Sequence, residues 1–175
     1  IMEISELIQT SLDEDIKNND VTSSLLIDSN LNATAHIIAK EPGVFFGSPI
    51  IESMDELIDS ISINAMVTDG AHLNKSDVCV SLTGNLKTIL ECERTLLNFL
   101  QRLSGISTIT HSFVSALNNP KIKILDTRKT TPLFRDLEKK AVVAGGGYNH
   151  RFGLYDMILV KENHLKYFLD SGNFE

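Results

Sequence analysis

Apolar residues recur at helical spacing in three stretches of the chain's first two thirds. Residues 3–16 place aliphatic side chains on one face and acids on the other, which predicts a helix. Residues 86–103 carry the strongest such pattern, and residues 106–117 repeat it after Ser104-Gly105, which we expect to interrupt the helix. A further helix is expected after Pro49, because proline is favoured in a helix's first turn.

Short apolar runs between these helices predict strands. The runs are 34–40, 61–67 and 78–82, and glycine-containing turns follow them at Pro42-Gly43, Asp69-Gly70 and Gly84. Helices and short strands in this order predict a small N-terminal α+β domain over residues 1–104.

The pattern changes after Pro120. Residues 121–125 (KIKIL) and 156–160 (DMILV) read as strands, each followed by a predicted helix, the first ending at three consecutive glycines. Strand and helix in alternation are typical of a parallel sheet or barrel. We therefore expect an α/β fold in which residues 105–175 form the first part of an open α/β barrel, since a complete (β/α)₈ barrel takes about 250 residues.

Charge divides the chain unevenly. Residues 1–120 hold 6 Lys and Arg against 16 Asp and Glu, a net charge of −10, whereas residues 121–175 hold 10 against 7, a net charge of +3. An acidic body argues against nucleic-acid binding, and the cationic end fits a small anionic ligand. No apolar stretch is long enough to span a bilayer and no secretion signal opens the chain. With two widely spaced cysteines, this predicts a cytoplasmic protein with reduced thiols.

The cationic end places its charges where an α/β fold places its chemistry. Arg128 and Lys129 follow the first predicted strand directly, and Lys161 follows the second. Ligands of parallel α/β folds bind beyond the carboxyl ends of the strands, so these three side chains should line one mouth. His150 and Arg151 follow the glycines, and an arginine offers a two-pronged donor for carboxylate or phosphate. Each of Arg128, Lys129 and Lys161 alone would more simply be a surface residue, but the three together at the ends of two strands favour a binding site.

Other polar residues have a structural interpretation. Arg94 lies on a polar stripe of the 86–103 helix, where pairing with Glu91 or Glu93 explains it as well as a ligand does. Thr130 and Thr131 could cap the helix expected from Pro132 to Ala144. Most of the remaining helical cations are interpreted as surface residues, namely Arg102, Arg135, Lys139 and Lys140.

Five segments together resemble the nicotinate-nucleotide pyrophosphorylase family, also called quinolinate phosphoribosyltransferase. They read SLDEDIKNNDVTSSLL, ECERTLLNFLQRLSGIST, DTRKTTP, AGGGYNHRFGL and VKENH, in that order along nearly the whole chain. The resemblance implies transfer of phosphoribose from phosphoribosyl pyrophosphate to quinolinate with loss of CO₂, which gives nicotinate mononucleotide and pyrophosphate in NAD biosynthesis. It also implies Mg²⁺ with the co-substrate and a homodimer or larger homo-oligomer with shared active sites.

Residue roles follow from the same resemblance. It implies that Arg128, His150 and Arg151 bind the carboxylates of quinolinate, with Arg94 reaching in from a second subunit. Lys129 and Lys161 would act as the catalytic residues near the phosphates and the reacting carboxylate. No residue is assigned as a metal ligand.

Two departures from the family pattern leave alternatives open. Leu133 stands where the family usually has glycine, a change we expect the fold to tolerate, and the chain ends after the second predicted barrel strand. A non-catalytic fragment that dimerises or binds ligand is therefore the alternative to an enzyme subunit. The related molybdenum-associated branch of the fold is disfavoured by the NHR and VKENH segments.

Overall fold

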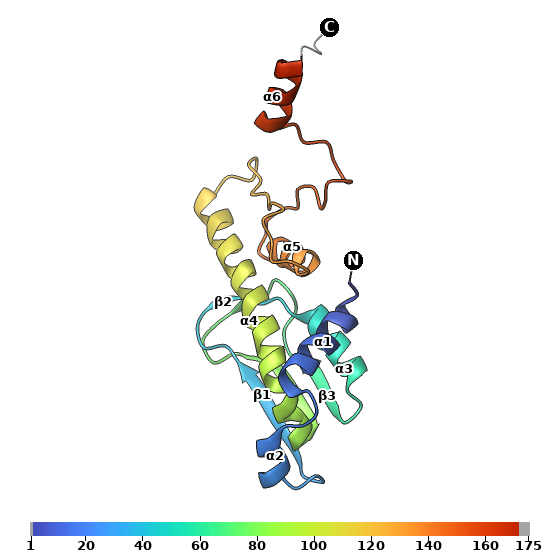
Figure 1. The fold of residues 1–175 in the computed structure, drawn as a ribbon. Helices are drawn as coiled ribbons and strands as arrows, with labels where there is room; N and C mark the ends of the chain where they lie inside the picture. The colour runs from blue at the N-terminus through green and yellow to red at the C-terminus, as the bar shows by residue number, and fades with distance from the viewer. Residues whose placement is uncertain (1, 172–175) are drawn as a thin grey trace.

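The structure is a computed structural model that describes residues 2–171 (Figure 1). Its helices are α1 (Ile4–Ile16), α2 (Val21–Leu26), α3 (Ser48–Leu57), α4 (Leu86–Leu117), α5 (Arg135–Ala144) and α6 (Glu162–Ser171). Its strands are β1 (Asn32–Ile38), β2 (Gly43–Val44), β3 (Ile61–Ala65), β4 (His72–Leu73) and β5 (Val78–Asn85). None of these helices is long and apolar enough to cross a membrane.

The core of the N-terminal part lies between an antiparallel sheet and three helices. The sheet has the strand order β1-β5-β3, and β2 pairs separately with β4. Alternate residues of β5 such as Val80 and Leu82 are buried, and they join apolar residues of α1, α3 and α4 in one cluster. The α+β arrangement predicted from the sequence is thus found, with three additions, α2, β2 and β4, that the strand and helix predictions did not include.

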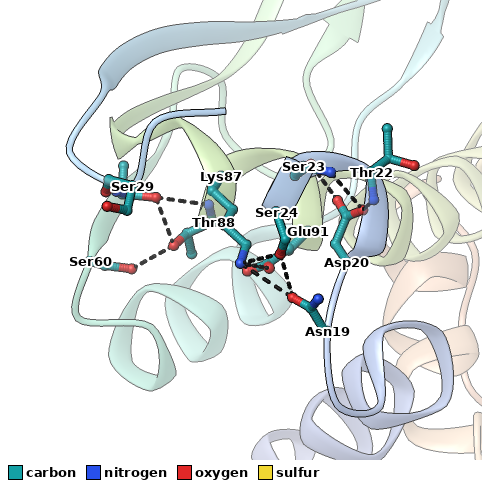
Figure 2. Close-up of polar contacts among 11 residues, drawn as sticks. Asn19, Asp20, Thr22, Ser23, Ser24, Ser29, Ser60, Lys87, Thr88 and Glu91 are labelled. Carbon is teal, nitrogen blue, oxygen red and sulfur yellow. Dashed lines mark hydrogen bonds and ion pairs between the residues drawn. The ribbon is translucent and has the colours of Figure 1, made fainter. Parts of the chain in front are cut away.

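Helix α2 is held in place by polar contacts rather than by an apolar face (Figure 2). Asp20 caps it by accepting hydrogen bonds from the backbone amides of Thr22 and Ser23, both at 3.0 Å. Lys87 of α4 donates to the Ser24 hydroxyl at 2.7 Å and also lies 3.7 Å from Glu91. This network anchors a six-residue helix that would not be stable alone.

Helix α4 runs without a break through Ser104 and Gly105, so the predicted interruption there is wrong. The Ser104 hydroxyl accepts a hydrogen bond from the backbone amide of Phe46 at 3.1 Å, and Thr108 accepts one from Val44 at 2.9 Å. Small hydroxyl residues let the β2 segment approach the helix closely, which explains why the sequence here resembles a break. The predicted domain boundary at 104/105 therefore falls inside a continuous helix of 32 residues.

The two barrel strands predicted at residues 121–125 and 156–160 are not formed in the described residues. One isolated parallel bridge joins Leu125 to Tyr148, and residues 154–171 are all exposed. In Figure 1, α6 stands apart from the rest of the molecule. A parallel strand needs hydrogen-bonded neighbours on its edges, and residues 2–171 supply only this one pairing. Both helices predicted in this part are present, although α5 begins at Arg135 rather than near Pro132.

Candidate active site

Two chain segments lie side by side at the end of α5 and carry four of the six predicted site residues. The backbone amide of Asp126 donates to the Tyr148 carbonyl at 3.0 Å, and the amide of Tyr148 donates to the Ile124 carbonyl at 2.9 Å. This parallel pairing brings the Arg128-Lys129 segment beside the His150-Arg151 segment. The backbone pairing thus brings these two segments together, but it does not include Lys161, which the sequence had placed with Arg128 and Lys129 at one mouth.

The arginine and histidine side chains in these segments differ in whether they form hydrogen bonds within the protein. Arg151 is 6% exposed and donates from Nη1 to the Met157 carbonyl at 3.1 Å. The Nε of Arg128 is buried and has no hydrogen-bond partner among the described residues. The imidazole of half-buried His150 makes no hydrogen bond to those residues either. Because an unpaired buried donor is costly, the Arg128 guanidinium is suited to an anionic ligand.

The other three predicted cations are exposed. Within residues 2–171, the side chains of Arg94, Lys129 and Lys161 form no hydrogen bond or ion pair, so Arg94 is not paired with either candidate glutamate. Lys161 lies in the exposed segment 154–171. Within the described residues, one hydrogen bond joins this segment to the other predicted cations, from Arg151 to the Met157 carbonyl. Arg94 lies in the N-terminal half of α4, and no contact within the described chain links it to the other five.

Lys139 is the clearest error among the residues interpreted as surface. Its side chain is 2% exposed, and its Nζ lies 2.5 Å from Oδ1 of Asp126, a residue to which the sequence assigned no role. Its neighbour Lys140 does lie at the surface, where it pairs with Asp136 at 2.8 Å. Helical phase gave no signal of this burial, because the residues one turn from Lys139 on α5 are half-buried or exposed.

Glu138 of α5 ties the first site segment to α4. Its carboxylate accepts hydrogen bonds from Arg102 Nη2 at 2.8 Å, from the Thr131 hydroxyl at 2.8 Å and from the Thr131 backbone amide at 3.2 Å. Burial alone would raise the pKa of this carboxyl, but these hydrogen bonds and the arginine charge together lower it below its usual value. Thr131 thus contacts Glu138 rather than capping the helix, whose N-cap Phe134 has no side-chain cap.

Replacing Glu138 with glutamine should lower stability at neutral pH and have less effect in acid. A carboxyl whose pKa is lowered by folding stabilises the folded state above its unfolded pKa of about 4.3, and this contribution disappears as pH falls through the folded value. Urea unfolding of the wild type and Glu138→Gln between pH 7 and pH 3 should therefore show a difference that shrinks below about pH 4. Asp136→Asn, which alters the exposed pair, is the control, and a pH-independent difference would contradict the assignment.

Leu133 has a left-handed backbone with φ of 67° in the turn before α5. A side chain in this region costs roughly 1–2 kcal/mol relative to glycine. Its side chain is 69% exposed, so no packing contact is disturbed by its size. The cost is small enough for the fold to tolerate, as the sequence predicts, and it explains why glycine is the natural residue for this position.

Two hollows of the described chain lie away from the predicted cations. A cavity of about 640 Å³ lies between β1, β2 and α4, and one of about 440 Å³ lies between α1, α4 and the Thr131–Phe134 turn. None of the six predicted side chains lines either hollow. In residues 2–171, no group of three or more His, Cys, Asp or Glu could hold a metal ion.

The fold is that of a mixed α/β protein, and its buried Arg128 Nε and Arg151 belong to a residue type suited to small anions such as carboxylates and phosphates. Two family models match the chain, the N-terminal domain of quinolinate phosphoribosyl transferase over residues 20–104 and its C-terminal domain over residues 106–173. The chain belongs to the quinolinate phosphoribosyl transferase family. The resemblance given by the sequence motifs is therefore confirmed.

Curated relatives and solved structures agree with this family. A probable nicotinate-nucleotide pyrophosphorylase (carboxylating) of Bacillus subtilis is 44% identical over 166 residues, which cover 94% of this chain and 57% of that protein. A mitochondrial quinolinate phosphoribosyltransferase (decarboxylating) of Nicotiana glauca is 39% identical over 93% of this chain and 46% of its own length. The chain spans about half the length of the curated relatives it matches.

Among solved structures, NadC from Streptococcus pyogenes superposes with a TM-score of 0.89 at 38% identity, covering 94% of this chain and 59% of that one. The nicotinate-nucleotide pyrophosphorylase from Francisella tularensis gives a TM-score of 0.86 at 37% identity, covering 97% and 64%. These similarities confirm the predicted fold class, an N-terminal α+β domain followed by part of an α/β barrel.

Proposed function

We propose that this chain is part of a phosphoribosyltransferase that converts quinolinate and phosphoribosyl pyrophosphate to nicotinate mononucleotide, pyrophosphate and CO₂. Its membership of the family supports the reaction class, and the relatives carry this activity in their names. The structural observation that carries the proposal is the buried, unpaired Nε of Arg128 beside the His150-Arg151 segment. A donor in this state is matched by a carboxylate, and quinolinate has two.

The residues suit the chemistry of the reaction. The ring nitrogen of quinolinate attacks C1 of the ribose while the bond to pyrophosphate breaks, so negative charge grows on the departing group. Fixed cations that hold this charge lower the barrier, and Lys129 and Lys161 are the ammonium groups assigned to it. The C2 carboxylate then leaves as CO₂, the ring nitrogen's positive charge stabilises the electron pair left behind, and a proton replaces the lost carboxylate.

Mg²⁺ belongs to the proposal as a companion of the co-substrate's pyrophosphate. The described residues offer no cluster of ligands for it, and Asp126 is already committed to Lys139. Its place is therefore beside the phosphate oxygens, where it would offset part of their charge when bound.

A cytoplasmic homodimer with shared active sites is the form in which we propose that the protein works. Helix α5 packs on α4 at Ser107, whose hydroxyl donates to the Ala141 carbonyl at 2.8 Å. Arg94 lies 13 residues before Ser107 on the same helix. At the rise and pitch of an α-helix this places Arg94 about 20 Å away and roughly on the opposite side of α4. Because Arg94 lies too far from the site of its own subunit, we propose that it contributes to the site of a second subunit.

Mixing two inactive variants tests the shared site. Arg94→Ala and Arg151→Ala should each lose activity in the full-length protein, because each removes a cation that holds substrate. Co-refolding them together should restore up to about a quarter of wild-type activity, since half of the dimers are mixed and one of their two sites is intact. Chromatographic detection of nicotinate mononucleotide supplies the measurement. A mixture as inactive as its components would contradict the shared site.

The same assay separates the enzyme from the alternative, a non-catalytic binding or dimerising module. The exposed residues 154–171 include many apolar side chains, which favours further packing partners for this segment. Purified full-length protein should form nicotinate mononucleotide from quinolinate, phosphoribosyl pyrophosphate and Mg²⁺. Quinolinate binding without product formation would favour the binding module.

A further inference from the structure

Beneath the candidate site lies a buried ion pair that the proposed chemistry does not use directly. The side chains of Lys139 and Asp126 are 2% and 6% exposed, and Lys139 Nζ lies 2.5 Å from Asp126 Oδ1. The same oxygen accepts the backbone amide of His150 at 2.8 Å. With its amide group in the orientation that satisfies both partners, Asn149 donates to Asp126 Oδ2 at 2.6 Å and to the Lys139 carbonyl at 2.9 Å.

Stability alone does not account for such a pair. Removing two charges from water costs several kcal/mol per ion, and well-packed apolar residues often do as well or better at the same place. What an apolar pair cannot supply is an acceptor for the His150 amide. This hydrogen bond fixes the backbone at the residue that carries the imidazole and immediately before the residue that carries the Arg151 guanidinium.

A second contact from the same face of α5 fixes the neighbouring part of both segments. Arg135 lies one turn before Lys139, and its guanidinium donates to the Thr130 hydroxyl at 3.0 Å and to the Phe152 carbonyl at 3.1 Å. Residues of one helix therefore hold the first segment at Asp126, Thr130 and Thr131 and the second at Asn149 and Phe152. Side chains that bind a small ligand need this support, because their own backbone is in loops.

We propose that Asp126 and Lys139 are positioning residues of this site. Asp126 fixes the His150 amide and thereby directs the His150 and Arg151 side chains toward the carboxylates of the substrate, and Lys139 keeps Asp126 ionised and in place. This inference rests on the proposed function, and it assigns to the pair an effect on substrate affinity beyond its effect on folding.

Two double variants of the full-length protein isolate that effect. Asp126→Asn with Lys139→Met removes both charges but leaves an acceptor oxygen for the His150 amide, whereas Asp126→Leu with Lys139→Met removes the acceptor as well. Both leave an uncharged pair, so both should fold, with melting temperatures close to each other. Lys140→Met, which breaks only the exposed pair with Asp136, is the control.

The KM for quinolinate and kcat should separate the doubles. We expect kcat/KM to fall by up to about 100-fold in the Leu–Met variant, mainly through KM, because small misplacements of binding groups cost this much. The Asn–Met variant should stay within about tenfold of the wild type, and Lys140→Met should be unchanged. Equal KM values in the two doubles, or a wild-type KM in the Leu–Met variant, would overturn the positioning role.

An NMR measurement keeps this inference apart from the proposed function. The backbone amide signal of His150 and the Nε–H signal of Arg151 should shift in the Leu–Met variant and stay in place in Lys140→Met. If the wild type neither binds nor converts quinolinate, the proposed function fails, and these signals alone decide the inference. Unshifted signals in the Leu–Met variant would then overturn it.

Discussion

Replacing Arg128 with alanine should lower the rate of nicotinate mononucleotide formation by about 10²–10³-fold while leaving the fold intact. The side chain carries a buried Nε donor with no partner among the described residues, so its removal breaks no hydrogen bond of the protein that the structure describes. The substrate would lose a charge-assisted contact, and such contacts are roughly twice as strong as neutral ones.

The measurement is initial-rate kinetics on the full-length protein with circular dichroism as the test of folding. Lys140→Ala provides a matched loss of one cation, since its ammonium pairs with Asp136 at the surface of α5. We expect Lys140→Ala to retain wild-type kinetics. A folded Arg128→Ala protein with near-normal turnover would remove Arg128 from the site.

Among the glycines at the end of α5, Gly145 should be the one whose replacement by alanine lowers stability most. A methyl group on Gly145 would lie 2.3 Å from the Ser107 carbonyl oxygen and 2.7 Å from Cβ of Thr110, both on α4. The backbone of a long helix cannot yield by that amount, so α5 must move away from α4. We expect Gly145→Ala to lower the free energy of unfolding by about 2–3 kcal/mol, toward the upper end of overpacking costs.

The same replacement at Gly105 should have the opposite effect and raise the free energy of unfolding. Gly105 lies inside α4, and no atom stands within 4 Å of the position its Cβ would take. Alanine in a helix interior is favoured over glycine by roughly 0.5–1 kcal/mol, so stability should rise. Urea unfolding of both variants checks the pair of predictions, and a change of the same sign in both would show that the packing of α5 on α4 is not what limits Gly145.

The sequence predicted best where local pattern decides structure. The helical spacing in α1, α3 and α4 and the short apolar runs of β1, β3 and β5 appear in the structure close to their predicted bounds. Their partners lie nearby in the chain, so the pattern and the packing agree. The KIKIL and DMILV segments carry equally good strand patterns, but a parallel strand depends on distant neighbours, and the described residues provide one bridge.

The sequence predicted the charged residues of the candidate site but not the buried contacts beneath them, such as that between Asp126 and Lys139. Residue type predicts that Arg128 and Arg151 bind anions, and motif resemblance placed the chain in its family. Nothing local distinguishes Lys139 from Lys140, since burial of the first depends on Asp126, which lies 13 residues earlier. The roles of the six predicted residues remain predictions for the experiments above.

The unbroken course of α4 restricts how the molecule can close around a ligand. One helix of 32 residues carries Arg94 in its first half and the contact with α5 in its second half. Bending this helix at Ser104 would break backbone hydrogen bonds in its middle. Helix α4 therefore offers no hinge between the N-terminal sheet and the place where α5 packs. Within the described residues, any movement around a ligand is then left to the segments that follow Leu117.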